Sequence, residues 1–110
     1  MIYRVRRHVD VERDILDLGL WIARDSREMA IRFFDAVESS IISLRSMPGK
    51  GSPKYLRDRR LAGIRSWAVQ GFPNHLILYD IRGDDVVVLA VVHGARRYSR
   101  LLRDRAKPSR

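Results

Sequence analysis

The sequence contains no cysteine, which excludes disulfide bonds and thiolate metal sites. This composition suits a reducing compartment, and we expect the protein to be cytoplasmic. The N-terminal segment has neither the apolar core nor the cleavage site of a secretion signal. The longest apolar run, Val86–Val92, is far too short to span a bilayer, so no membrane partner is expected.

Familiar catalytic motifs are also absent. The three histidines, at positions 8, 75 and 93, have no metal-ligand spacing, and no acidic cluster accompanies them. The chain has no nucleophile elbow and no glycine-rich phosphate loop. Asp84 and Asp85 are adjacent, but they lie in a predicted turn rather than forming a pair of catalytic carboxylates. The sequence therefore predicts no metal ion and no cofactor.

Positive charge is abundant and unevenly distributed. The 110 residues include 22 Lys and Arg against 13 Asp and Glu, for a net charge of +9. Residues 1–48 carry eight charges of each sign, whereas residues 94–110 carry seven Lys and Arg against one Asp. A concentrated basic segment favours an acidic partner, such as nucleic acid, an anionic protein surface or an acidic inhibitor. The length is that of a single domain.

The apolar run Val86–Val92 is the most informative stretch. Five of its residues are valine, and β-branched side chains favour a strand. Because the run lacks polar alternation, it predicts a strand buried on both faces and near the middle of a sheet. It ends at His93 and Gly94, and the chain then becomes strongly basic, with Arg96, Arg97, Arg100 and Arg103.

Two amphipathic helices are predicted in the first half of the chain. Asp10 is a candidate N-cap, and apolar residues follow at helical spacing until about residue 24. Ser26 is a candidate N-cap for a second helix, which we expect to end at Met47–Gly49. The short connection predicts an antiparallel helical hairpin. Trp21 and Phe34 lie at the edges of the apolar stripes, where they either fill the seam between the helices or form a shelf for a partner helix.

The remaining strands are expected at Ile2–Val5, Leu61–Val69 and His75–Ile81. Gly49–Arg60 is a predicted basic loop, whose lysines either contact phosphates or are simply solvated. The element order is then β-α-α-β-β-β, an α+β fold with a helical hairpin on one face of a small, mostly antiparallel sheet and a short C-terminal helix. We expect the other face to be free for function, with Arg65 and the segment after His93 converging there.

A basic constellation is the strongest candidate for chemistry. Arginine stabilises charge on a phosphorane, histidine moves protons, and tyrosine stacks on a base, so such a set can bind and cleave RNA. The alternative for His93 is a hydrogen-bonded structural role at the end of a buried strand. The constellation consists of Arg65, His93, Arg96, Arg97, Tyr98 and Arg100.

Several tracts resemble the ParE branch of the RelE/ParE toxins across residues 2–102. They are Gly63-Ile64-Arg65, Gly71-Phe72, the segment HLILYDI with its Tyr79, and Val92-His93-Gly94-Ala95-Arg96-Arg97. The resemblance implies a single toxin domain at residues 1–105, followed by a flexible basic tail at 106–110. It also implies the toxin of a type II toxin–antitoxin pair, held inactive by a ParD-like antitoxin whose C-terminal segment wraps around it.

The family offers two mechanisms. ParE-type toxins poison DNA gyrase without catalysis of their own, and this is the leading hypothesis. RelE-type relatives cut mRNA on the ribosome, and this alternative would make Arg65, His93, Arg96 and Tyr98 catalytic. The target-binding residues implied by the resemblance are Arg65, His93, Arg96, Arg97, Tyr98, Arg100 and Arg103. The antitoxin-binding residues expected on the helical hairpin are Leu16, Leu20, Trp21 and Phe34.

Overall fold

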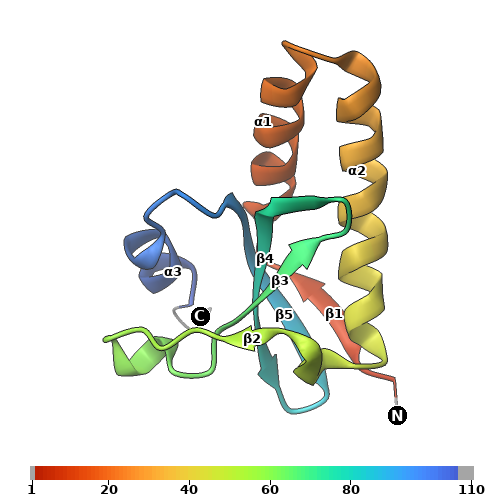
Figure 1. Ribbon diagram of the computed structural model, residues 1–110. Helices are drawn as coiled ribbons and strands as arrows, with labels where there is room; N and C mark the ends of the chain where they lie inside the picture. The colour runs from red at the N-terminus through yellow and green to blue at the C-terminus, as the bar shows by residue number, and fades with distance from the viewer. Residues whose placement is uncertain (1, 107–110) are drawn as a thin grey trace.

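The computed structural model describes residues 2–106 and has an α+β fold, with the predicted order of elements confirmed. Its sheet has five strands in the order β1-β5-β4-β3-β2. β1 runs parallel to β5, and the other neighbours are antiparallel, as Figure 1 shows. The strands are β1 (Arg4–Arg7), β2 (Ser52–Pro53), β3 (Arg65–Val69), β4 (Phe72–Arg82) and β5 (Asp85–His93).

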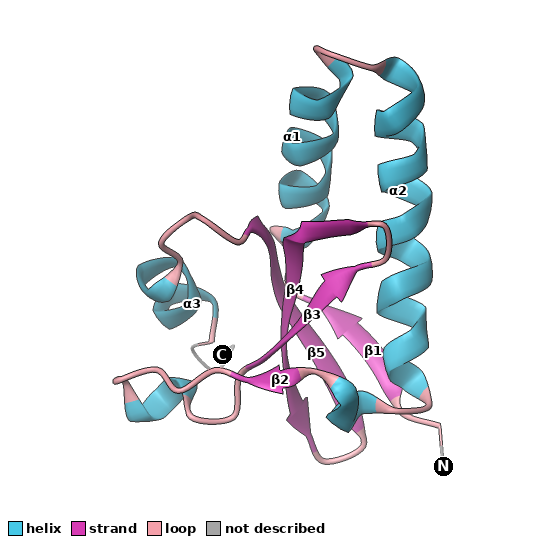
Figure 2. Ribbon diagram, in the orientation of Figure 1, coloured by secondary structure: helices cyan, strands magenta, loops and turns pink. Residues whose placement is uncertain are grey.

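The helical hairpin consists of α1 (Val11–Ala23) and α2 (Arg27–Ile42), which stand side by side in Figure 2. Ser26 caps α2 as predicted, because its Oγ accepts a hydrogen bond from the Met29 main-chain N–H at 3.1 Å. Asp10 occupies the N-cap position of α1, but its side chain makes no capping hydrogen bond. The prediction that the second helix reaches Met47 was wrong, since the chain tightens into a 3₁₀ turn after Ile42.

β5 is the buried strand that the sequence predicts, and it lies between β1 and β4. From Val86 to Val92 every residue except Val87 is buried. Tyr79 pairs with Val88 and Leu78 pairs with Ala90, so Leu89 is an extra residue that forms a β-bulge. Its carbonyl and the N–H of Val91 are bonded by side chains of other elements instead of a neighbouring strand.

Both faces of the sheet are covered, which contradicts the expectation of a free face. The hairpin buries the larger core, which includes Phe33 and Val88. On the opposite face a smaller core forms under α3 (Ser99–Arg105) and the 3₁₀ turn Arg59–Leu61, where Leu61 and Leu102 are fully buried. A strand that is apolar on both faces requires cover on both, and these two segments supply it.

Several boundaries differ from the sequence prediction. The first strand begins at Arg4, and the predicted loop 49–60 contains β2 and parts of two 3₁₀ turns, Pro48–Lys50 and Arg59–Leu61. Phe72, predicted in a turn, begins β4 instead. The turn before it depends on Gly71, which adopts a positive φ of 82°. Gly83, with φ of 58°, forms the predicted hairpin turn into β5. Ala106, predicted in the tail, ends α3 and packs against the smaller core, while 107–110 lie outside the described residues.

Candidate target-binding and antitoxin-binding surfaces

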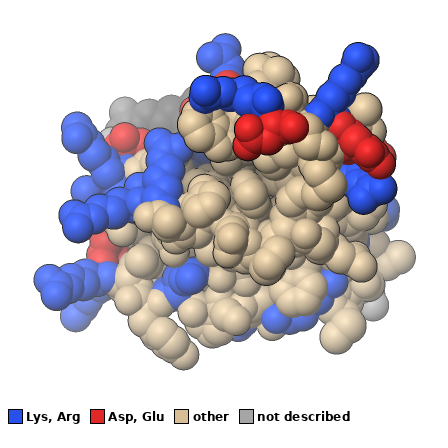
Figure 3. All heavy atoms as spheres, turned by 45° about the horizontal axis from the view of Figure 1, so that its top comes forward, with Lys and Arg blue, Asp and Glu red and all other residues tan. Residues whose placement is uncertain are grey.

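A basic groove runs between the loop before β3 and the N-terminal end of α3. Its main hollow, of about 500 Å³, is lined by Leu56, Gly94, Arg96, Arg97, Tyr98, Ser99, Arg100 and Arg103. A second hollow of about 330 Å³ shares Leu56, Ser99 and Arg103 with the first and adds Tyr55, Arg57, Asp58 and Leu61. We call the two together the basic groove. Figure 3 shows Lys and Arg side chains gathered at the left edge of the molecule, the side on which α3 lies in Figure 1.

Both walls of the basic groove are anchored in the smaller core. Leu61 holds the loop wall and Leu102 holds the helix wall, and both side chains are fully buried. The chain leaves β5 through Gly94, whose N–H donates to the Asn74 carbonyl at 2.6 Å. A side chain at position 94 would meet that carbonyl at 3.3 Å, so glycine suits the close approach. The arginines are therefore carried on a fixed corner that the end of β5 positions.

The basic groove has a strong positive charge that its own residues leave unbalanced. Five arginines line it, at positions 57, 96, 97, 100 and 103, and none of them forms a salt bridge with another residue of the described range. The lining carboxylate, Asp58, is held by Arg60 at 2.8 Å. Hydrogen bonds from the side chain and main chain of Arg60 lower the pKa of Asp58 to about 2. Asp58 is thus already paired with an arginine that does not line the groove.

Arg65 does not converge with this groove, contrary to the sequence prediction. Its neighbour across the β3–β4 ladder is Tyr79, which faces the core under the helical hairpin. The Arg65 guanidinium donates to the carbonyls of Gly49 and Gly51, at 3.2 and 2.7 Å, and so holds the loop after α2. The predicted convergence failed because the direction of a strand side chain depends on register, which composition does not give.

The His93 side chain does not line the basic groove either, although the next residue, Gly94, does. It is paired with His75 across β4 and β5, and their ring centroids are 5.2 Å apart. The His75 ring packs against Phe33 of α2, which places both histidines on the hairpin side of the sheet. Burial, reinforced by the neighbouring His93, lowers the pKa of His75. The Nδ1 atom of His93 accepts a hydrogen bond from the Ala95 N–H at 3.1 Å, which fits the structural alternative for this residue.

The four candidate ribonuclease residues therefore fall into three places. Arg96 and Tyr98 share the basic groove, whereas Arg65 and His93 lie on the hairpin side. Arg65 is level with Tyr79 of β4, and His93 is level with His75, which precedes Tyr79 by four residues in that strand. At about 3.3 Å per residue, this offset is about 13 Å along the sheet.

The helical hairpin carries an exposed apolar surface on α1. Leu16, Leu20 and Trp21 are 48%, 56% and 67% exposed, and we call these three the hairpin surface. Phe34 is different, because it is half-buried against Gly19 of the facing helix. A Cβ atom on that glycine would lie 2.1 Å from the Phe34 ring, so the two residues fit together in the seam. Phe34 therefore takes the packing role that the sequence left open, while Trp21 remains exposed, with the Arg24 guanidinium over its ring at 4.5 Å.

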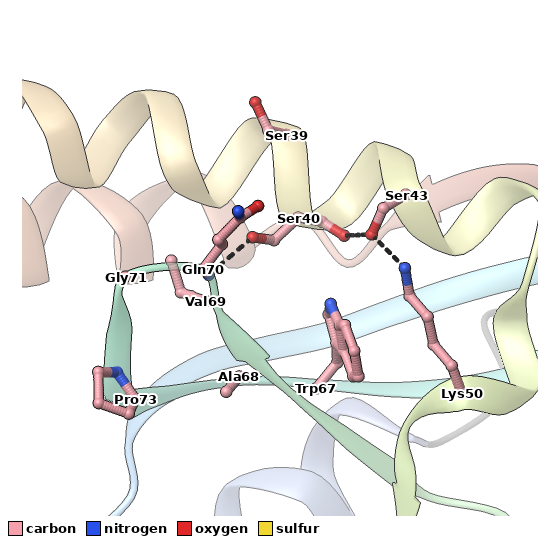
Figure 4. Close-up of a pocket in the computed structure, with 10 residues that line it drawn as sticks. All are labelled: Ser39, Ser40, Ser43, Lys50, Trp67, Ala68, Val69, Gln70, Gly71 and Pro73. Carbon is pink, nitrogen blue, oxygen red and sulfur yellow. Dashed lines mark hydrogen bonds between the residues drawn. The ribbon is translucent and has the colours of Figure 1, made fainter.

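A separate cavity, outside the basic groove and of about 380 Å³, lies between α2 and β3 (Figure 4). Lys50 lies over the Trp67 ring at 4.6 Å and donates to the Ser43 hydroxyl at 2.8 Å. The Ser40 hydroxyl accepts a hydrogen bond from the Gln70 N–H at 3.0 Å. Lys50, predicted in a loop, ends the 3₁₀ turn Pro48–Lys50, and the sequence did not predict this cavity. The only available signal was the group of serines at positions 39, 40 and 43, near the end of a predicted helix.

Two further features bear on what the chain can bind. Within residues 2–106 no group of three or more His, Cys, Asp or Glu side chains is arranged to hold a metal ion. No helix among the described residues is both long and apolar enough to cross a membrane.

Comparison with known proteins identifies the chain as a toxin of the ParE/RelE superfamily, the toxin component of a type II toxin–antitoxin system. More particularly, it belongs to the ParE toxin family. The model of the ParE toxin of the type II toxin–antitoxin system parDE matches residues 5–98. The family assignment made from the sequence is thereby confirmed.

The chain resembles several solved structures, two of which are toxin–antitoxin systems. One is the chromosomal ParDE toxin–antitoxin system from P. aeruginosa, with a TM-score of 0.66 and 10% identity, covering 84% of this chain and 96% of that one. The other is the RelBE2 toxin–antitoxin complex from Mycobacterium tuberculosis, with a TM-score of 0.58 and 28% identity, covering 87% and 95%. No curated protein sequence matches the chain.

Proposed function

We propose that this toxin inhibits DNA gyrase by binding, without catalysis of its own, and that a cognate ParD-like antitoxin neutralises it in the cytoplasm. The ParE family match over residues 5–98 supports gyrase as the target. The observation that carries the non-catalytic part is the separation of Arg65 and His93 from the basic groove. General acid–base groups and the charge that stabilises a phosphorane must reach the same phosphate, within about 3 Å of the atoms they serve.

The basic groove is the proposed target-binding surface. It combines five guanidinium groups without a salt-bridge partner among the described residues, and four of the five come from the C-terminal segment that carries most of the net charge. Arg97, Arg100 and Arg103 would meet an anionic surface of the gyrase–DNA complex, together with Arg96 and Tyr98. Arg65 and His93, which the family resemblance placed in the same set, would contribute through the positions of the loop and the strand end that they hold.

The hairpin surface is the proposed antitoxin-binding surface. An amphipathic antitoxin helix would pack its apolar face against Leu16, Leu20 and Trp21, while its acidic residues would offset the toxin's charge of +9. In the double variant Leu16→Asp/Leu20→Asp, antitoxin binding should weaken by about tenfold or more, because two apolar contacts are replaced by charges. Ile31→Asp/Ile42→Asp is a matched control, since both residues lie on the other helix and are 54% and 56% exposed. Equal losses in both variants would refute this assignment.

Purified gyrase provides the test of the target. Adding the toxin to a supercoiling reaction should block supercoiling or trap cleaved DNA, and adding the antitoxin encoded beside it should restore the reaction. Folded toxin that binds its antitoxin but leaves gyrase unaffected would contradict the proposal. The same folded toxin can then be tested for cleavage of mRNA on ribosomes, which the alternative function predicts.

The second candidate is a RelE-like ribosome-dependent ribonuclease, and the likeness to the RelBE2 complex at 28% identity favours keeping it. It predicts mRNA cuts on translating ribosomes that disappear in Arg65→Ala or Tyr98→Ala. Our proposal expects no such cuts. Because Arg65 also holds the loop at Gly49 and Gly51, Tyr98→Ala is the more informative of the two variants.

A further inference from the structure

An exposed tyrosine in the basic groove, Tyr55, indicates a more specific ligand than an anionic surface. Tyr55 lines the second hollow and is 93% exposed. Tyr98 lines the first hollow, with its ring half-buried against the smaller core. An aromatic side chain this exposed contributes almost nothing to folding by burial. Its ring is therefore available to a ligand that is held by Arg57 and Arg103 in the same hollow.

The combination of arginine and tyrosine favours nucleic acid over an acidic peptide. Guanidinium groups bind phosphate oxygens with two parallel hydrogen bonds, and they bind carboxylates equally well, so arginine alone does not discriminate. A flat exposed ring distinguishes nucleic acid from an acidic peptide, because a nucleobase stacks on it and an acidic side chain does not. Stacking on Tyr55 requires a base that is not already stacked inside a duplex, which favours a single strand.

We propose that the basic groove is a binding site for single-stranded nucleic acid. The phosphodiester backbone lies against the five groove arginines, and a base stacks on Tyr55. This inference builds on the proposed function, because it assigns a ligand to the groove proposed to bind the target. The binding test below uses no gyrase and no ribosome, so the two proposals can fail separately. In the cell it would let the toxin hold a strand exposed by its target.

The experiment measures fluorescence anisotropy of a labelled single-stranded oligothymidylate with the full chain, in the absence of any other protein. Binding should weaken as salt is raised, with a slope in log K against log salt of about −0.7 for each phosphate contacted. Five contacts give a slope of about −3.5, and Arg100→Ala should reduce its magnitude by about 0.7. Arg27→Ala removes the same charge from the far end of the hairpin and should leave the slope unchanged.

Stacking is tested separately from charge. Tyr55→Ala should weaken oligothymidylate binding by about tenfold, and Tyr55→Phe should retain it, since both rings offer a face to a base. Because Tyr55 is 93% exposed, both variants should fold normally, and circular dichroism checks this. A duplex of the same sequence should bind more weakly than the single strand.

Several results would overturn the proposal. One is no binding of oligothymidylate at low salt. Another is an equal loss in Arg27→Ala and Arg100→Ala, which would indicate attraction by net charge alone. Polyglutamate competing as effectively as the oligonucleotide, with Tyr55→Ala having no effect, would identify an acidic protein surface as the ligand instead. Inhibition of gyrase by a Tyr55→Ala variant that has lost oligonucleotide binding would leave the proposed function intact.

Discussion

The salt bridge between Asp14 and Arg105 should be the polar contact whose loss lowers the free energy of unfolding most. The two side chains are only 10% and 12% exposed and form two hydrogen bonds, at 2.5 and 2.9 Å. Asp14 also accepts from the Val91 N–H at 3.1 Å, and Arg105 donates to the Leu89 carbonyl at 3.0 Å. One ion pair thus ties α1, α3 and the bulge of β5 together where β1 ends.

Removing Arg105 leaves Asp14 as a buried, unpaired charge, and removing Asp14 leaves the buried Arg105 with only the more distant carboxylate of Asp10, at 3.9 Å. Such a loss costs about 3–5 kcal/mol, out of a total stability of about 5–15 kcal/mol for a domain. We therefore expect Asp14→Ala and Arg105→Ala each to lower the free energy of unfolding by about 3 kcal/mol or more. At about 4 °C for each kcal/mol, Tm should fall by roughly 10–20 °C. Because α3 forms one wall of the basic groove, these variants should also weaken oligonucleotide binding.

Urea unfolding followed by circular dichroism gives the free energies, and the double variant Asp14→Ala/Arg105→Ala completes a thermodynamic cycle. The double variant should cost clearly less than the sum of the two single ones, since no unpaired charge remains. Arg32→Ala is the control, because its pair with Glu28 is fully solvated and should be worth less than about 0.5 kcal/mol. If Asp14→Ala destabilises no more than Arg32→Ala does, the reasoning is wrong.

Three further changes have defined outcomes in the same unfolding assay. Tyr79→Phe should cost about 1–3 kcal/mol, since the buried hydroxyl donates to one main-chain carbonyl and accepts from one N–H of the loop after α2; no loss would contradict this role. Gly19→Ala should cost about 1–3 kcal/mol by overpacking against Phe34, and Phe34→Leu should recover part of that loss. Because burial lowers the pKa of His75, the folded state binds fewer protons than the unfolded chain below about pH 6.5. Stability should therefore fall as the pH drops through that value and level off below the folded-state pKa, and a His75→Gln variant that kept the full slope would exclude this histidine as its source.

The fold was largely predictable because its signals are local. The unbroken apolar run of β5, the helical spacing of α1 and α2, and the Ser26 cap each depend on neighbouring residues. Boundaries failed where tertiary contacts intervene. Leu61 was predicted in a strand, yet it lies in a 3₁₀ turn because it fills the smaller core beneath α3.

The candidate surfaces were predictable only in part, because they depend on register and long-range contacts. The groove arginines at 96, 97, 100 and 103 follow directly from the dense basic segment after β5. The opposite orientation of Arg65 follows from its pairing with Tyr79, which no local pattern reveals. The pairing of Asp14 with Arg105 joins residues 91 positions apart, and only the folded chain brings them together.

The most direct test of this account is gyrase supercoiling titrated with three toxins in parallel: the unaltered chain, Arg96→Ala/Arg100→Ala and Arg27→Ala. The account predicts inhibition by the unaltered chain and by Arg27→Ala, and at least a tenfold higher concentration for half-inhibition with the double groove variant. Equal inhibition by all three folded proteins would contradict the claim that the basic groove is the surface by which this toxin acts.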